Sequence, residues 1–222
     1  MHDVGIYENL ILGIHFLLLK KCKIFDEKTI VRCYTGRSMR IKVRKHERRG
    51  YQSIKMSNIL EKQFLKQRND FEKSCVERDK KYHFPQGVIF ETDIAYAKDK
   101  NKAHRLDRYR PKGKETQILP VIINVHGGGL LLGNKEFNKY FCALLSKKGF
   151  LVYSMEYRLI PDCTFFDQLR DIFLAMDFVK EHAAADGGDL SHVYLVGDSG
   201  GACLATYANA IQNSKKLQRQ RA

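Results

Sequence analysis

The sequence predicts an α/β fold in which a mostly parallel sheet is flanked by helices. The first observation is that apolar runs alternate with amphipathic segments from residue 118 onward. The second is that two glycine-rich motifs, at residues 126–129 and 197–201, each follow an apolar run. Because the carboxyl ends of parallel strands share one edge of a sheet, we expect these two motifs to lie at the same edge.

The expected core elements alternate along the chain. The apolar runs 118–125, 150–157 and 192–196 are predicted to be strands buried on both faces. Apolar residues spaced by three and four predict a helix after each of the first two strands. Those residues are Phe137, Tyr140, Phe141, Leu144 and Leu145 for one helix, and Leu169, Ile172, Phe173, Met176 and Val179 for the other. A third helix is expected over 200–212, and further strands are expected over 87–97 and 105–110.

The composition and the pattern of apolar residues change near residue 82, which divides the chain into two parts. Residues 82–222 form the expected α/β core, and residues 1–81 form a basic, partly helical region. In that region Leu10 to Leu19 is expected to be a buried helix, and 54–81 a helix. The apolar side chains of the second helix fall near one face, at Leu60, Phe64, Phe71 and Cys75, whereas Glu61, Lys62, Lys66 and Arg68 are expected to be solvated.

The charge and the apolar pattern indicate which classes of partner and which cellular compartment to expect. The net charge is +14, which suits anionic partners, but no aromatic-interleaved basic motif indicates nucleic acid, and a solvated surface is the preferred interpretation. The apolar run from Leu10 to Leu19 is too short to span a membrane and does not fit a secretory signal. We therefore expect a soluble, cytoplasmic protein, with a peripheral membrane contact as the alternative.

The six cysteines form no Cys-x-x-Cys pair, and no histidine stands at metal-ligand spacing from them. We expect reduced, mostly buried thiols, including a packing role for Cys203. Neither a metal nor an organic cofactor is implied.

The motif Gly197-Asp198-Ser199-Gly200-Gly201 has the form of a nucleophile elbow, a strand-to-helix turn that exposes one serine. Side chains at Gly197 and Gly201 would collide with the neighbouring strand and helix. The amide of Gly200 would stand at a helix N-terminus, where it can stabilise negative charge. Acyl transfer needs such a nucleophile together with donors for the oxyanion.

A second motif, His126-Gly127-Gly128-Gly129, supplies the expected remaining donors. Three consecutive glycines after a buried strand are costly in backbone entropy, and they allow a loop to bring its amides close to a ligand. We therefore expect the amides of Gly127, Gly128 and Gly200 to form an oxyanion hole beside Ser199. His126 belongs to this loop and is not expected to be a general base.

Together these two motifs resemble the α/β-hydrolases of the hormone-sensitive-lipase-like esterase group. Glu156 to Asp162 is similar to that family's Tyr-Arg-Leu-Ala-Pro-Glu segment, and Asp186 to Asp189 is also similar. The likeness extends from about Gly87 to Asn213. It implies hydrolysis of small carboxylic esters through an acyl-Ser199 intermediate, and a role as a cap over the acyl pocket for residues 1–81.

The family's triad runs Ser, Asp or Glu, then His along the chain. Asp198 occupies the elbow position and is not the triad acid, and residues 200–222 contain no Asp, Glu or His. The C-terminal part of the fold is thus expected to be missing, and His192 to Val196 to form a sheet edge. This chain alone is expected to be nearly inactive. The alternatives are a non-catalytic truncated product or binding module, or one half of a split enzyme.

Overall fold

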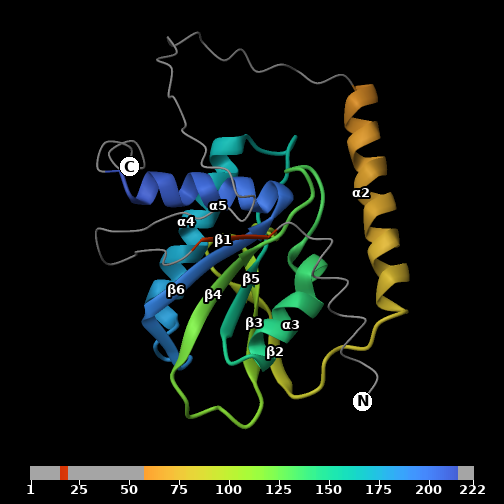
Figure 1. Ribbon diagram of the computed structural model, residues 1–222. Coiled ribbons are helices and arrows are strands. Elements are labelled where there is room, and N and C mark those ends of the chain that lie inside the picture. Colours follow the sequence, from red (N-terminus) through yellow and green to blue (C-terminus); the bar gives the residue numbers. More distant parts are fainter. Residues whose placement is uncertain (1–15, 20–57, 215–222) are drawn as a thin grey trace.

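The computed structural model describes residues 16–19 and 58–214, which are built around a six-stranded sheet (Figure 1). The strands are β1 (Phe16–Leu19), β2 (Val88–Ala95), β3 (Arg105–Pro111), β4 (Leu119–Val125), β5 (Leu151–Met155) and β6 (Gly188–Asp198). The helices are α2 (Asn58–Asp79), the short 3-10 helix η1 (Lys135–Asn138), α3 (Lys139–Lys147), α4 (Phe165–His182) and α5 (Ser199–Gln212). The alternation predicted from residue 118 onward is confirmed.

The sheet has the strand order β1-β6-β4-β5-β3-β2. β4 pairs in parallel with both β5 and β6, whereas β3 is antiparallel to β5 and to β2. The α/β class is confirmed, and parallel pairing is confined to the three central strands. In this register Val125 stands beside both Met155 and Gly197, so β4 and β6 end at the same edge.

The expectation for the N-terminal apolar run is wrong where the structure describes it. Residues 16–19 are a strand, not a helix, and they pair antiparallel with β6 from Phe16 opposite Asp198 to Leu19 opposite Leu195. A run of uniformly apolar residues carries no period, so it does not distinguish a short helix from a strand. β6 is consequently paired on both sides over these residues, and the predicted exposed edge is covered there.

Helices cover both faces of the central sheet because successive side chains of each strand point to opposite sides. Leu195 of β6 belongs to the larger apolar cluster, which contains residues of α4 and α5. Its neighbour Val196 belongs to the smaller cluster, which contains Cys142 and Ala143 of α3. α4 begins with a capping box, in which Thr164 and Asp167 exchange hydrogen bonds between side chain and backbone.

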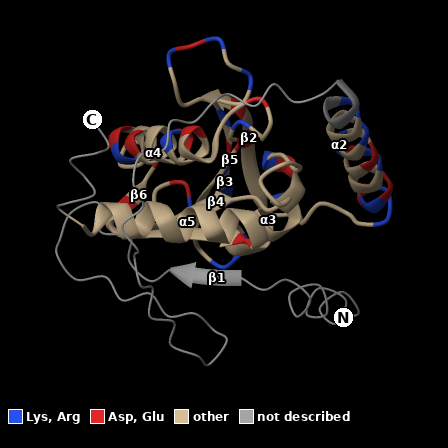
Figure 2. Cartoon of the chain, turned by 90° about the horizontal axis from the view of Figure 1, so that it is seen from above, with Lys and Arg blue, Asp and Glu red and all other residues tan. Residues whose placement is uncertain are grey.

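Helix α2 differs from the other helices in its dense charge, and Figure 2 shows the contrast with the uncharged helix α5. The half-buried positions of α2 follow one face, at Phe64, Arg68, Phe71, Cys75, Arg78 and Asp79. The predicted apolar face is therefore confirmed for the side chains that the structure describes, but the prediction that Arg68 is solvated is wrong. No helix within the described ranges is long and apolar enough to cross a membrane.

Candidate active site

The strand-to-helix turn at Ser199 has the backbone shape of an elbow. β6 ends at Asp198 and α5 begins at Ser199, whose φ of 45° lies in the left-handed region that non-glycine residues rarely adopt. Residues 195–198 are buried, but Ser199 is exposed, and its hydroxyl has no hydrogen-bond partner among the described residues. The turn thus presents one serine to solvent at the end of a buried strand.

The end of β4 lies directly against the first turn of α5. A Cβ on Gly201 would stand 2.2 Å from the carbonyl oxygen of Val125 and 2.4 Å from that of His126. A Cβ on Gly197 would stand 2.6 Å from the carbonyl carbon of Gly201. Only glycine allows the backbones to approach this closely, which agrees with the steric reason inferred from the sequence.

The segment after β4, residues 126–132, is called the glycine loop below. It closes in a tight turn, because the amides of Leu131 and Leu132 both donate to the carbonyl of Gly128, at 3.2 and 2.9 Å. Gly128 has a φ of 117°, and a Cβ there would stand 2.1 Å from the carbonyl oxygen of Leu132. The turn therefore requires glycine at this position.

His126 is fully buried at the start of the glycine loop. Its Nδ1 donates to the carbonyl of Gly127 at 2.8 Å, and its ring stacks on Tyr157 with centroids 4.2 Å apart. The Tyr157 hydroxyl in turn donates to the carbonyl of His126 at 2.8 Å. A ring enclosed in this way shapes the loop and has no access to a proton on Ser199.

Asp198 joins the elbow to the glycine loop. The side chain is 6% exposed, and its Oδ1 accepts from the Gly127 amide at 2.9 Å and from Asn138 Nδ2 at 2.8 Å. The Gly127 amide proton is therefore engaged by Asp198 in this structure, and its use as an oxyanion donor would require this bond to break. A buried carboxylate such as Asp198 needs a donor, and the motif alone does not show which one.

The amides that follow Gly127 are placed differently. Within residues 58–214 the structure shows no hydrogen bond from the amides of Gly128 and Gly129. A Cβ on Gly200 would stand 3.1 Å from the Gly129 nitrogen and 3.0 Å from the Leu130 nitrogen. The loop amides thus lie beside the first turn of α5, where the helix's own first amides have no intrahelical partner.

Two residues that the sequence did not single out fix the far side of the loop. Leu130 has a φ of 71°, and its carbonyl accepts from Ile160 N at 3.0 Å and from Gln168 Nε2 at 2.9 Å. Gln168 also donates to the carbonyl of Arg158 at 2.9 Å. A buried glutamine on an apolar helix face was the available signal, since such a side chain must find polar partners.

A buried polar chain supports Asn138. Asn124 donates from Nδ2 to Ser154 Oγ at 3.1 Å, and Ser154 donates to the carbonyl of Lys135 at 2.9 Å. These residues hold η1 against β4 and β5. Asn124 stood out in the sequence as a polar residue within an apolar run, but sequence alone did not identify its partners.

The remaining described histidines and carboxylates near β6 are remote from Ser199. His192 lies next to Val193, which pairs with Val121 at the opposite end of β4 from the elbow. Its Nδ1 lies 2.7 Å from Asp189, and hydrogen bonds from Ser191 and His192 lower the pKa of Asp189 to about 2. His182 is exposed at the end of α4. The predicted placement at the far end of its element is confirmed for His182, whereas His192 lies within β6 because that strand begins at Gly188 and not at residue 192.

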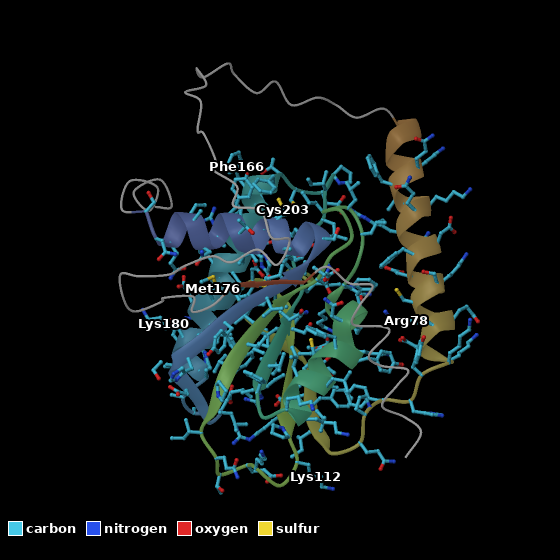
Figure 3. The ribbon with its side chains drawn as sticks, in the orientation of Figure 1. Arg78, Lys112, Phe166, Met176, Lys180 and Cys203 are labelled. Carbon is cyan, nitrogen blue, oxygen red and sulfur yellow. The ribbon has the colours of Figure 1, made fainter. Side chains whose placement is uncertain are left out.

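The described cysteines are free, but the prediction that they are mostly buried is wrong. Only Cys142 is buried, and burial raises the pKa of its thiol to about 12. Cys203 is exposed on the outer face of α5 (Figure 3), so its predicted packing role is also wrong. Cys22 and Cys33 lie outside the described residues. Within the described part, no group of three His, Cys, Asp or Glu side chains could hold a metal ion.

One cleft among the described residues lies away from the serine. It measures about 310 Å³ and is lined by Arg108, Arg110 and Asp186 among others, near the start of β6. Arg108 pairs there with Glu91 at 2.6 Å and with Asp186. The charged groups that line the cleft therefore pair with one another. The two glycine motifs lie at the other end of the sheet.

Comparisons with known proteins agree with this fold. The BD-FAE family profile matches residues 106–222, more than half of the chain. Over 115 residues the chain is 32% identical to isoprenylcysteine alpha-carbonyl methylesterase ICME of Arabidopsis thaliana. This alignment covers 52% of the chain and 27% of that protein. Over 128 residues the chain is 30% identical to the probable carboxylic ester hydrolase LipM of Mycobacterium tuberculosis, covering 57% of this chain and 30% of that protein.

Among solved structures, the chain is similar to esterase B of Lactobacillus rhamnosis in a phosphonate-inhibited form. The TM-score is 0.71 at 29% identity, over 75% of this chain and 54% of that one. The chain thus spans less than a third of the two curated relatives and about half of the esterase. The family profile includes both glycine motifs and the segment between them. The chain belongs to the BD-FAE family and has the α/β-hydrolase fold of esterases.

Proposed function

We propose that this chain carries the nucleophile and the oxyanion hole of a serine hydrolase that acts on carboxylic esters. The observation that carries the proposal is the exposed Ser199 at a φ of 45°, held beside the glycine loop by the bond from Gly127 to Asp198. A strained, exposed serine at the N-terminus of a helix is the arrangement that acyl transfer requires. The relatives named methylesterase, ester hydrolase and esterase support an ester as the substrate.

In this proposal Ser199 Oγ attacks the carbonyl carbon of the ester, and the carbonyl oxygen becomes an oxyanion. The amides of Gly128, Gly129 and Gly200 donate to that oxygen, while Gly127 serves the loop instead through Asp198. Collapse of the tetrahedral intermediate releases the alcohol and leaves an acyl-Ser199 ester, which water then hydrolyses. Gly197 and Gly201 permit the close packing of the elbow, and His126 shapes the loop.

The proton of Ser199 needs an acceptor, and none of the side chains that the structure describes forms a hydrogen bond with the Ser199 hydroxyl. Residues 200–222 contain no Asp, Glu or His, and His126 is enclosed. A serine triad that has lost its base still accelerates the reaction about 10³–10⁴-fold over the uncatalysed reaction in water, because the oxyanion hole and substrate binding remain. We therefore expect very slow turnover by this chain alone.

The test compares the wild-type chain with Ser199→Ala and with the control Ser191→Ala, which removes an exposed serine from the other end of β6. A fluorophosphonate probe and p-nitrophenyl acetate are the reagents. We expect slow covalent labelling of the wild-type chain and of Ser191→Ala, no labelling of Ser199→Ala, and ester turnover close to background in all three. Equal labelling of wild type and Ser199→Ala would exclude Ser199 as the nucleophile. Rapid turnover that Ser199→Ala abolishes would refute the expected lack of a base.

A further inference from the structure

Arg68 on α2 reaches out of its own helix to two loops at the candidate active site. Its Nε donates to the carbonyl of Leu131 at 3.0 Å, and its Nη2 donates to the carbonyl of Ile160 at 2.8 Å. Its Nη1 pairs with Asp162 at 2.7 Å, and the arginine side chain is only 16% exposed. One planar guanidinium therefore links the glycine loop to the loop that follows β5.

The two carbonyls are not independent of the oxyanion donors. Leu131 is the second residue after Gly129, and its own amide closes the turn onto Gly128. Ile160 already donates from its amide to Leu130. Arg68 thus adds a second connection between two segments that touch at Leu130. Because the guanidinium donors have a fixed fork geometry, the distance between the two loops is fixed as well.

The C-terminal end of α2 is held at η1, the segment that follows the glycine loop. Arg78, which Figure 3 labels near the end of α2, donates to the carbonyl of Phe137 at 2.9 Å. Its guanidinium carbon lies 5.5 Å from the centre of the Phe137 ring. Phe71 packs on the same ring, with centroids 5.1 Å apart. Arg68 and Arg78 are ten residues apart, about 15 Å along the helix. The C-terminal half of α2 therefore runs along the segment 131–137 and is attached at the middle of the helix, through Arg68, and near its C-terminal end, through Arg78.

We propose that α2 holds the glycine loop in the shape that directs its amides at Ser199, with Arg68 as the positioning residue. The helix lies outside the region that the family profile matches, which begins at residue 106. Its role is thus assigned by contacts of this chain alone. The catalytic consequence rests on the proposed function, whereas the effect on loop geometry does not.

The first test measures amide hydrogen exchange of Leu131 and Leu132 in the whole folded chain, with β4 as an internal reference. Arg68→Gln is expected to speed exchange of these two amides about tenfold, because two charge-assisted bonds to carbonyls are lost. Arg68→Lys should speed it less, since one ammonium cannot reproduce the fork. The control Lys66→Gln removes an exposed charge from the same helix, and Asp162→Asn removes the ion pair but leaves both carbonyl bonds. Both should exchange like wild type.

Three results would overturn the proposal. The first is that the Leu131 and Leu132 amides exchange no faster in Arg68→Gln than in Lys66→Gln. The second is that amide exchange in Arg68→Gln rises by the same factor in β4. The third is that exchange of the two amides in Asp162→Asn is as fast as in Arg68→Gln. The second test measures fluorophosphonate labelling of Ser199. We expect Arg68→Gln to lower the labelling rate at saturating probe severalfold, with the half-saturating concentration unchanged, and Arg68→Lys to recover part of it. An unchanged rate would overturn the catalytic role. If the wild-type chain is not labelled at Ser199, the proposed function fails, and exchange alone decides the role of α2.

Discussion

Replacing Asp198 by alanine tests the connection between the elbow and the glycine loop. The substitution leaves two buried donors, the Gly127 amide and Asn138 Nδ2, without the oxygen they share at 2.9 and 2.8 Å. A hydrogen bond to a charged group contributes about 1.5–3 kcal/mol, and an unpaired buried donor costs a similar amount. Two such losses predict a decrease of about 3–6 kcal/mol in the free energy of unfolding.

Asp198→Asn is the matched variant, since its amide oxygen can accept from both donors at the same position. The new NH2 group would replace Oδ2, which lies close to Gly127, and we expect a cost of about 1 kcal/mol. Asp70→Ala, on the exposed side of α2, should stay within about 0.5 kcal/mol of wild type. Urea unfolding followed by far-UV circular dichroism is the assay, because the chain contains no tryptophan.

Two outcomes would refute this reasoning. If the free energy of unfolding of Asp198→Ala lies within about 1 kcal/mol of the wild-type value, the shared hydrogen bonds do not hold the loop. If Asp198→Asn is as unstable as Asp198→Ala, the negative charge matters and not the pair of bonds. Retained stability of Asp198→Asn together with loss in Asp198→Ala assigns the effect to the accepting oxygen.

The remaining predictions concern a glycine pair and a helix cap. Gly201→Ala places a Cβ 2.2 Å from a backbone carbonyl oxygen and should prevent folding. In Gly129→Ala the new Cβ meets no atom within 4 Å, so the substitution should cost only the strain of the left-handed backbone, about 1–2 kcal/mol. Equal midpoints of urea unfolding for the two variants would contradict this prediction. Hydrogen bonds from Thr164 lower the pKa of Asp167 below its ordinary value of 3.8, so the ionised cap stabilises α4 above that pH and less below it. Thr164→Ala should therefore cost about 1 kcal/mol at pH 7 and less at pH 3, and a constant difference in urea unfolding would count against the cap.

The central fold was predictable because its elements have distinct periods. The spacing of Leu169, Ile172 and Phe173 fits only a helix, and all three side chains are buried. The elbow and the loop were predictable from their glycines, because few other residues allow such turns. In contrast, Phe16–Leu19 has no period, so its assignment as a strand depends on pairing with β6, which lies far away in the sequence.

The contacts within the site were less predictable than its position. That Gly127 donates to Asp198 depends on which buried donor faces a short carboxylate, and a motif does not encode that choice. Arg68 was assigned to solvent because of its charge, although its spacing from Phe64 and Phe71 places it on the same helix face. That spacing was a usable signal. Charged residues in register with an apolar face usually bind something on the protein.

The hydrogen bond between Gly127 and Asp198 joins residues that are 71 positions apart in the chain. Closing so long an intervening chain is entropically costly, so this bond requires β4 and β6 to lie side by side. We expect the glycine loop to reach its final position against Asp198 only after β6 has joined β4. A nascent or partly unfolded chain would present the serine without its oxyanion donors, so the reactivity of Ser199 would report completion of the sheet.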